Sequence, residues 1–328
     1  MKDTNILNMP KLDLHCHLDG SLSSSFVRSC LLDTAALSED ELMSRLRAPE
    51  SCSSLTEYLT CFDLPILCLK SRENIKNAVL DVIEAVSKEN VAYIEIRFAP
   101  TFSLSRELGY QDIFEGAIEG CRLGYEKYNV HSGIIACAMR HLDMDTNLSM
   151  LRVAREYLGN GVLALDLAGD ESAFSNELFA DLFKEATRLN MPFTIHSGEC
   201  GSSENVRFAL EAGAARVGHG IALIKDSQLM EDCKRARLGL ELCPTSNYQT
   251  GAVKPDEIYP LDTFLRMGLL ATVNTDNRTV SNTTLSAELD FSTKKLGIEK
   301  GDLIQLYKNG IEISFADCDI KNYLYKLI

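Results

Sequence analysis

Four of the six histidines of this 328-residue chain occur in three short polar segments. They are His15 and His17 in the segment 15–20, His196 in the segment 194–199, and His219 between two glycines. Each segment follows an apolar or β-branched run, which is typical of the end of a strand. Side chains alternate between the faces of a strand, so His15 and His17 can bind one ion while Cys16 points away. This spacing predicts a hydrolytic metal centre.

A catalytic zinc ion takes about three nitrogen and oxygen ligands and keeps an open position for water, whose pKa it lowers to about 7. The residues that would supply such a ligand set are His15, His17, His196 and Asp276. Glu199 follows on a turn of small residues, so its carboxyl group can approach a substrate without binding the metal. His219 is suited to be the partner of the reacting water.

Eight runs with strand composition occur along the chain, and each is followed by a helical pattern. The predicted strands are 12–17, 93–98, 132–139, 162–167, 193–196, 216–217, 238–242 and 269–274. Strands that alternate with helices indicate a parallel sheet, and eight repeats without a second core predict one (β/α)₈ TIM barrel domain over residues 1–328. Every predicted polar cluster falls at the carboxyl end of a strand, which is the active-site face of such a barrel.

Helical spacing marks two core-facing stripes. They are Ile75, Val79, Val82 and Val86, and then Leu285, Leu289 and Leu296 ahead of Gly297. The connection after the first strand, about 21–90, is unusually long, and we expect a helical insertion over the C-terminal mouth of the barrel. Its apolar cluster comprises Leu55, Tyr58, Leu59, Phe62, Leu64 and Ile66. Plain packing is the more frequent role of such a cluster, and a lid that excludes water is the alternative.

The composition limits the partners and the compartment. A net charge of −14 and a pI near 4.9 argue against a nucleic-acid partner and favour a neutral or cationic small molecule. Eleven cysteines without a Cys-x-x-Cys pair suit a reducing compartment, and Cys16 is expected in the core. No apolar leader or membrane span is evident, so we expect a soluble, cytoplasmic protein that is a monomer or a weak homodimer.

Taken together, the motifs resemble the adenosine deaminase family of the metal-dependent amidohydrolase superfamily. The matching segments are 15–21, 95–100, 166–171, 196–199, 218–220, 243–247 and 274–276, in family order. The joint match is specific, whereas a His-x-His pair alone would be weak evidence. The resemblance implies deamination of adenosine or 2′-deoxyadenosine to inosine or deoxyinosine and ammonia, in purine salvage.

The resemblance also implies roles for individual residues. One zinc per chain is expected on His15, His17, His196 and Asp276, although iron, cobalt or manganese could occupy the same ligands. Glu199 would protonate purine N1, and His219 and Asp276 would orient or deprotonate the water that attacks C6. Expected substrate contacts are Gly169 N–H with N3, Asp19 with the ribose hydroxyls, Asn277 with N7, and further contacts from His17 and Phe62.

Asn277 departs from the best-known family pattern, in which a second carboxylate follows the metal-binding aspartate. A carboxyl group must be protonated to donate to N7, whereas an amide donates without that requirement. We therefore expect the reaction type to survive and the affinity or substrate detail to change. The competing interpretation is that Asn277 merely caps the following turn.

Other members of the fold and other deaminases are alternatives. Segment 164–169 lacks the lysine typical of binuclear amidohydrolases, and the His-x-Glu and Pro-Cys-x-x-Cys motifs of cytidine-type deaminases are absent. An AMP deaminase would need cationic phosphate contacts and usually a longer chain. Adenine deaminases typically carry Glu where Asp19 stands, which favours the nucleoside, and a catalytically silent nucleoside-binding relative is the alternative from another class. Structural roles are expected for Arg97, Arg140 and His141, the last two through hydrogen bonds to strand-end carboxylates.

Overall fold

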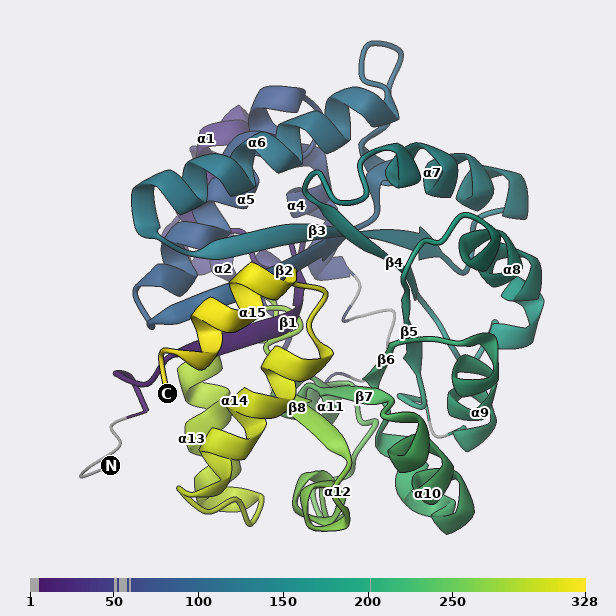
Figure 1. Ribbon diagram of the computed structural model, residues 1–328. Coiled ribbons are helices and arrows are strands. Elements are labelled where there is room, and N and C mark those ends of the chain that lie inside the picture. Colours follow the sequence, from purple (N-terminus) through teal and green to yellow (C-terminus); the bar gives the residue numbers. More distant parts are fainter. Residues whose placement is uncertain (1–5, 50–51, 53–57, 59, 201) are drawn as a thin grey trace.

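The computed structural model describes residues 6–49, 52, 58, 60–200 and 202–328, and within them parallel strands alternate with helices (Figure 1). All eight predicted strands are present, with ends shifted by at most two residues. The strands are β1 (Lys11–His17), β2 (Val91–Phe98), β3 (His131–Met139), β4 (Val162–Ala168), β5 (Thr194–Ser197), β6 (Arg216–His219), β7 (Gly239–Leu242) and β8 (Leu270–Val273). The predicted α/β class is therefore confirmed.

The strands form two four-stranded parallel sheets, in the orders β1-β2-β3-β4 and β5-β6-β7-β8. The sheets meet at both edges through single backbone bridges. One bridge pairs Leu165 of β4 with Phe193 just before β5, and the other pairs Cys16 of β1 with Asp276 just after β8. Because all strands run parallel, their carboxyl ends meet on the same side of the molecule.

Helices surround the strands in Figure 1. They are α1 (Ser24–Cys30), α2 (Glu39–Leu46), α4 (Asp63–Cys68), α5 (Arg72–Ser87), α6 (Tyr110–Tyr128), α7 (Met144–Glu156), α8 (Ala180–Arg188), α9 (Ser203–Ala212), α10 (Ser227–Ala236), α11 (Pro244–Gln249), α12 (Leu261–Met267), α13 (Leu285–Lys295), α14 (Asp302–Ile313) and α15 (Cys318–Tyr325). None of the described helices is long and apolar enough to cross a membrane.

The two predicted helix stripes are buried. On α5 the buried side chains include Ile75, Val79, Val82 and Val86, which pack in the main core. Leu285 and Leu289 are buried on α13, which ends just ahead of Gly297 at a φ of +77°. A left-handed backbone is favourable for glycine and ends a helix without steric cost. Cys16 is fully buried in the main core, as predicted.

The long connection between β1 and β2 holds α1, α2, α4 and α5. Tyr58 and Phe62 pack beside Ala48, Cys61 and Val280 in a small separate cluster. Leu64 packs against the main core, whereas the predicted cluster members Leu55 and Leu59 lie outside the described residues. α5 packs on α6 and β2, so the last part of the connection is an ordinary outer helix.

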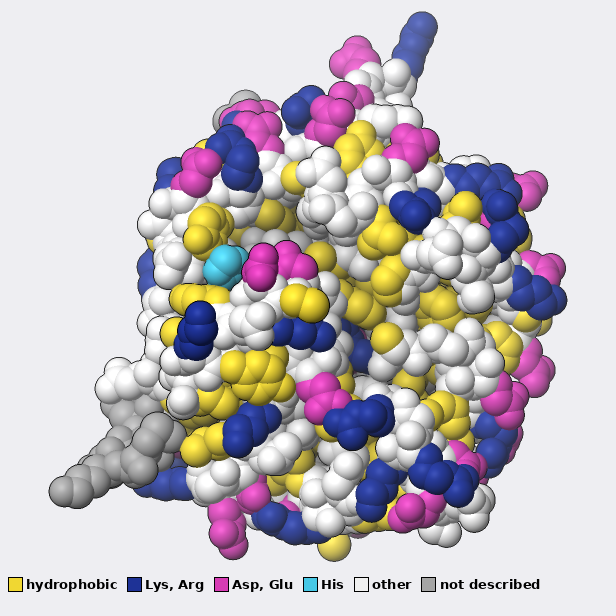
Figure 2. Space-filling model, viewed as in Figure 1, with side chains coloured by type: hydrophobic (Ala, Val, Ile, Leu, Met, Phe, Trp, Pro, Cys, Tyr) yellow, Lys and Arg dark blue, Asp and Glu magenta, His cyan; other side chains and the backbone are white. Residues whose placement is uncertain are grey.

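Charged side chains of both signs are interspersed on the face shown in Figure 2. Lysine and arginine do not gather into one patch on this face of the described surface, and hydrophobic side chains are scattered among them. The described part of this face therefore carries a mixed distribution of charge.

Candidate active site

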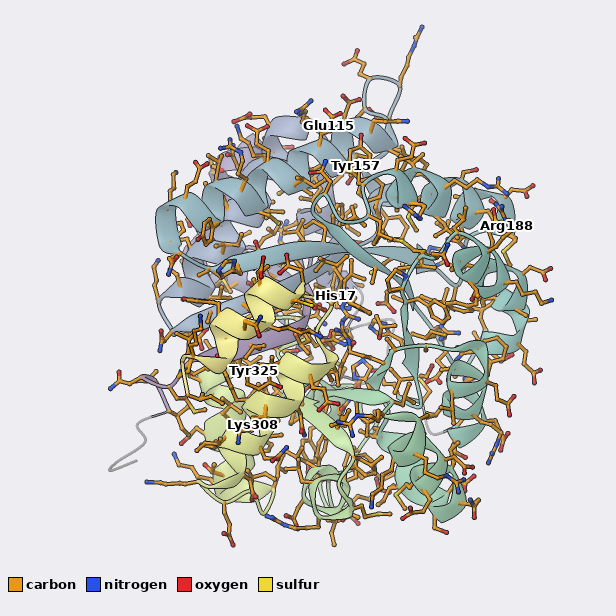
Figure 3. All side chains as sticks on the ribbon, viewed as in Figure 1. His17, Glu115, Tyr157, Arg188, Lys308 and Tyr325 are labelled. Carbon is orange, nitrogen blue, oxygen red and sulfur yellow. The ribbon has the colours of Figure 1, made fainter. Side chains whose placement is uncertain are left out.

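A cavity of about 810 Å³ opens at the carboxyl ends of the strands. Figure 3 shows His17 near the centre of the ring of strands, whereas Arg188 lies on an outer helix. Tyr58, Phe62 and Ile66 contribute to the wall from the long first connection. The sequence-predicted site residues that line the cavity are His17, Asp19, Phe62, Gly169, His196, Glu199, His219, Asp276 and Asn277. His15 lies beneath its floor with no exposed surface.

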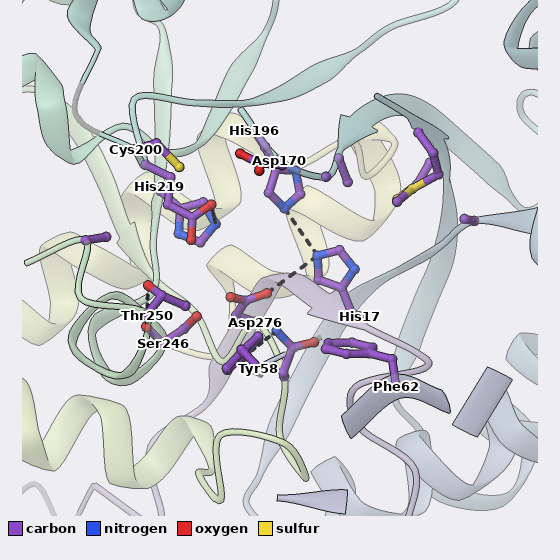
Figure 4. Close-up of a pocket in the computed structure, with 18 of the residues that line it drawn as sticks. His17, Tyr58, Phe62, Asp170, His196, Cys200, His219, Ser246, Thr250 and Asp276 are labelled. Atoms are coloured by element: carbon purple, nitrogen blue, oxygen red, sulfur yellow. Dashed lines mark hydrogen bonds and ion pairs between the residues drawn. The ribbon is translucent and has the colours of Figure 1, made fainter. Parts of the chain in front are cut away.

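Three imidazoles and one carboxylate, those of His15, His17, His196 and Asp276, converge at the floor of this cavity. Figure 4 shows His17, His196 and Asp276. His17 Nε2 lies 3.2 Å from His196 Nε2 and 3.5 Å from Asp276 Oδ1. His15 Nε2 lies 3.4 Å from the same Asp276 oxygen and has no hydrogen-bond partner of proper geometry among the described residues. Buried polar atoms are normally hydrogen-bonded, so this orphaned nitrogen fits a metal ligand. Three nitrogens and one oxygen are a donor set that zinc accepts.

Two carboxylates orient the histidines from behind. Glu241 Oε2 lies 2.8 Å from His15 Nδ1, and Asp166 Oδ2 lies 3.0 Å from His196 Nδ1. Each Nδ1–H therefore donates to a carboxylate, which leaves a lone pair on Nε2 directed into the cluster. Such partners fix the tautomer and the ring orientation of a metal-binding histidine.

The protonation of the cluster suits a cation. Burial lowers the pKa of His15 and lowers that of His17 well below its usual value, so both imidazoles are neutral near pH 7. Burial opposes the ionisation of Asp276, but the neighbouring imidazole of His15 holds its pKa well below the usual range. His15 and His17 therefore offer neutral nitrogens beside an ionised carboxylate, whereas at His196 burial is outweighed by the Asp166 carboxylate, which raises the pKa of the imidazole.

The backbone at two of these residues is left-handed, with φ +62° at His219 and +59° at Asp276. Non-glycine residues adopt this conformation rarely, and only where the surroundings determine it. At Asp276 the surroundings are two short backbone bonds to β1, from Asp276 N to His15 O and from His17 N to Asp276 O, both 2.7 Å. The bonds place the carboxylate directly beside the two β1 histidines.

His219 is held in one tautomer. The hydroxyl of Tyr259 donates to Asn247 Oδ1 at 2.8 Å, so the amide nitrogen of Asn247 donates to His219 Nδ1 at 3.0 Å. His219 Nε2 then carries the proton, and it lies 3.6 Å from Glu199 Oε2. An N–H donor and a carboxyl group thus face each other beside the metal-ligand cluster.

Glu171 fixes the loop that carries Glu199. Its carboxylate accepts the backbone N–H groups of Gly198, Glu199 and Cys200 at 2.6, 2.9 and 3.0 Å, and the amide of Asn205 at 2.8 Å. A carboxylate that accepts four donors is firmly held. The sequence marked Glu171 as part of a strand-end cluster but predicted no role for it.

Other predicted substrate contacts present unpartnered groups to the cavity. Asp19 Oδ1 is buried and has no hydrogen-bond partner among the described residues, and burial raises the pKa of its carboxyl group to about 6. Asn277 Nδ2 donates to the hydroxyl of Tyr58 at 2.9 Å, and its Oδ1 is left without a partner. The side chain of Asn277 therefore turns to Tyr58 and the cavity, not to a capping bond in the following turn.

Sequence reasoning missed the supports of the site. It expected a structural role for Arg97 without naming its partners and gave no role to Glu241, although a charged residue within an apolar strand needs a buried partner and is thereby a signal. Arg140 was expected to donate to strand-end carboxylates. It donates instead to the carbonyls of Phe174 and His196 and to the amide oxygen of Asn176. The N–H groups of Arg140 are therefore taken up by backbone carbonyls and a side-chain amide.

His141 also differs from the expectation of a carboxylate partner. Its ring stacks on Phe102 with centroids 5.7 Å apart and an interplanar angle of 17°. Both residues line the cavity, so this pair forms an aromatic part of its wall.

Comparison with known proteins places this geometry in a family. A family model described as adenosine deaminase matches residues 10–328. An adenosine deaminase of Enterococcus faecalis is 38% identical over 331 residues, which is 100% of this chain and 98% of the relative. An adenosine deaminase of Clostridium botulinum is 35% identical over 98% of this chain and 97% of its own length.

Solved structures share the fold at lower identity. A zinc-bound amidohydrolase of Burkholderia ambifaria superposes with a TM-score of 0.88 at 20% identity, covering 99% of this chain and 92% of that one. An adenine deaminase of Arthrobacter aurescens superposes with a TM-score of 0.86 at 22% identity, covering 97% of this chain and 98% of that one. An Arabidopsis N6-mAMP deaminase superposes with a TM-score of 0.85 at 23% identity, covering 98% of both chains.

Proposed function

Because this chain belongs to the adenosine deaminase family, we propose that it is a zinc-dependent hydrolase that converts adenosine and 2′-deoxyadenosine to inosine and deoxyinosine with release of ammonia. The observation that carries the proposal is the convergence of a three-histidine, one-aspartate cluster with Glu199 and His219 in one cavity. A binding protein needs no proton donor beside such a cluster. Purine salvage is the proposed setting.

His15, His17, His196 and Asp276 would hold the zinc ion. When bound, zinc supplies a Lewis acid that lowers the pKa of water to about 7 and so provides a nucleophile at neutral pH. The supports behind the histidines keep their Nε2 lone pairs in place, because Glu241 and Asp166 accept the opposite ring protons.

The proton transfers fall to three side chains. The carboxyl group of Glu199 protonates purine N1, which makes C6 electrophilic. His219 donates from Nε2 toward the oxygen that attacks C6, because its Nδ1 already accepts from Asn247. The ionised carboxylate of Asp276 accepts the proton of the attacking water. Asp276 passes this proton to the amino group on C6, the C6–N bond breaks, and ammonia leaves, while the remaining hydroxyl proton restores the carboxyl group of Glu199.

The cavity wall would orient the nucleoside. The unpartnered carboxylate oxygen of Asp19 accepts from a ribose hydroxyl, and Asn277 donates its second amide proton to N7. The backbone N–H of Gly169, where φ is +109°, meets N3. His17 and Phe62 pack beside the base from the floor and the wall of the cavity.

The proposal extends to the architecture and the setting of the chain. The two sheets would act as one closed (β/α)₈ barrel in a single domain, with the segment of about 21–90 inserted over its mouth. Cys16, Cys137 and Cys243 carry free thiols, in agreement with the proposed cytoplasmic location. Adenine deaminase activity is the alternative, because the carboxylate of Asp19 can also face the edge of a free base.

Ammonia release, followed with the ultraviolet change at C6, tests the proposal. Adenosine, deoxyadenosine, adenine and AMP are offered in parallel, with and without a zinc chelator. We expect turnover of the two nucleosides only, lost with chelator and regained with zinc. Turnover of free adenine alone would support the adenine deaminase alternative, and no turnover by folded, zinc-loaded protein would overturn the enzymatic proposal.

A further inference from the structure

One guanidinium group connects the two carboxylates that orient the metal-site histidines. Arg97 NH1 donates to Asp166 Oδ2 at 2.9 Å, and Arg97 NH2 donates to Glu241 Oε2 at 2.7 Å. Glu241 Oε2 also accepts from His15 Nδ1 at 2.8 Å, and Asp166 accepts from His196 Nδ1 through its other oxygen, Oδ1, at 3.2 Å. A continuous chain of hydrogen bonds thus runs from one imidazole, through Arg97, to the other.

Arg97 also fixes the strand that carries two of the histidines. Its NH2 group donates to the carbonyl of Leu14 at 2.6 Å, immediately before His15. Its own carbonyl accepts from Leu18 N at 2.8 Å, immediately after His17. The side chain is fully buried, so water cannot replace these bonds.

The chemistry of the connection calls for arginine. A guanidinium group is planar, always charged, and offers several donors in a fixed fork, whereas a lysine presents a single mobile ammonium group. Only the fork can hold two carboxylates and a backbone carbonyl at defined angles at once.

We propose that Arg97 is a positioning residue that aligns His15 and His196 together through Glu241 and Asp166, and so preorganises the metal site. The inference rests on the proposed metal-dependent function and deepens it. Arg97 touches neither substrate nor metal, and its effect is exerted on the lone-pair directions of the two imidazoles.

Arg216 provides a matched control. It is equally buried and donates to the same carboxylate, but to Glu241 Oε1 at 2.6 Å, with Thr194 as a second donor there at 2.9 Å. Its other partners are Glu95 Oε2 at 2.5 Å and the carbonyl of Ile313 at 2.9 Å. Arg216 therefore supports Glu241 without reaching the histidine-bound oxygens or Asp166.

The test measures zinc affinity by competition with a chromogenic chelator for the wild type, Arg97→Lys and Arg216→Lys, with folding checked by circular dichroism. We expect Arg97→Lys to bind zinc about 10- to 100-fold more weakly and Arg216→Lys to stay within about threefold of the wild type. An unchanged affinity in Arg97→Lys, or an equal loss in Arg216→Lys, would overturn the inference. A folded wild type that binds no zinc would overturn the proposed function instead.

A double-mutant cycle tests the same link if Arg97→Lys does not fold. Zinc affinity is measured for Asp166→Asn, Glu241→Gln and the double variant. If Asp166 and Glu241 act independently, the loss of zinc affinity in the double variant should equal the product of the two single losses to within about a factor of two. A guanidinium that couples them predicts a double loss at least about fivefold smaller than the product, because the first substitution already loosens both histidines. Multiplicative losses would contradict the proposal.

Discussion

Glu199 Oε2 and His219 Nε2 lie 3.6 Å apart, and the two residues come from consecutive strand ends of the second sheet. Glu199 follows β5 and His219 ends β6. His219 bears its proton on Nε2, so an N–H donor and a carboxyl group lie side by side in the cavity that holds the histidine cluster. In the proposed reaction the carboxyl group meets purine N1, and the N–H group meets the oxygen that attacks C6.

Replacing Glu199 with Gln should abolish most turnover and leave zinc binding intact. An amide cannot supply the proton for N1, and general acid catalysis contributes about 10²- to 10⁴-fold. Glu199 is not among the proposed metal ligands, so the metal content should not change. Glu204→Gln, at an exposed position of α9, is the matched control. Steady-state kinetics and the zinc content are measured for both variants and the wild type. A Glu199→Gln variant with more than a tenth of wild-type turnover would contradict the assigned role.

Replacing Asn277 with Asp should add a titration to the pH profile of kcat/KM. A carboxyl group donates to N7 only while it is protonated, so the activity of the variant falls about tenfold per pH unit above the pKa of the new group. The wild-type amide does not titrate and has no such decline. Asn282→Asp, exposed in the following turn, is the control. Identical profiles for the variant and the wild type would remove Asn277 from substrate binding.

Replacing Glu171 with Gln should lower kcat without affecting zinc affinity. The amide keeps one acceptor oxygen but turns an NH₂ group toward N–H donors of the 198–200 loop. Losing charge-assisted bonds of about 1.5–3 kcal/mol displaces the loop that carries Glu199, so we expect kcat to fall about 10- to 100-fold. Glu177→Gln, exposed nearby, should leave kcat unchanged. A kcat within twofold of the wild type would show that the loop needs no such support.

The buried Glu288 should make stability depend on pH. Burial raises its pKa from 4.5 to about 7, although Thr245 N and Thr283 Oγ1 donate to its carboxyl group. Between pH 4.5 and 7 the unfolded chain releases this proton while the folded chain keeps it, so stability falls as pH rises through that window. Below it the contribution is fully present.

The variant Glu288→Gln lacks this titration. Its free energy of unfolding relative to the wild type should therefore rise from pH 5 to pH 8 by on the order of 2 to 3 kcal/mol. Urea denaturation at the two pH values measures the change, and the exposed Glu299→Gln is the control. The same difference between variant and wild type at both pH values would show that Glu288 titrates normally.

The order of strands and the histidine segments could be predicted because both depend on local patterns. Apolar runs mark the strands, and a strand's alternation places His15 and His17 on one face. The partners behind the histidines could not be predicted in the same way. Glu241 is 226 residues from His15, and their contact depends on how the two sheets adjoin.

Tertiary contacts likewise determine which residues meet at the wall of the cavity. Tyr58 meets Asn277 across 219 residues, and no spacing in the sequence relates them. Glu241 and Arg97 each interrupt an apolar strand with a charge, which indicates a buried partner but not its identity. Thus the ligand types are visible in the sequence, whereas their supports require the fold.

The division of the strands into two sheets bears on how the protein assembles. His15 and His17 belong to the half that contains β1–β4, whereas His196, His219 and Asp276 belong to the half that contains β5–β8. Neither half holds a full ligand set, so a tightly bound ion can be captured only after the halves have joined. The free energy of binding a metal at the proposed site would then oppose the separation of the halves, so the ion would stabilise the association of two parts of one polypeptide.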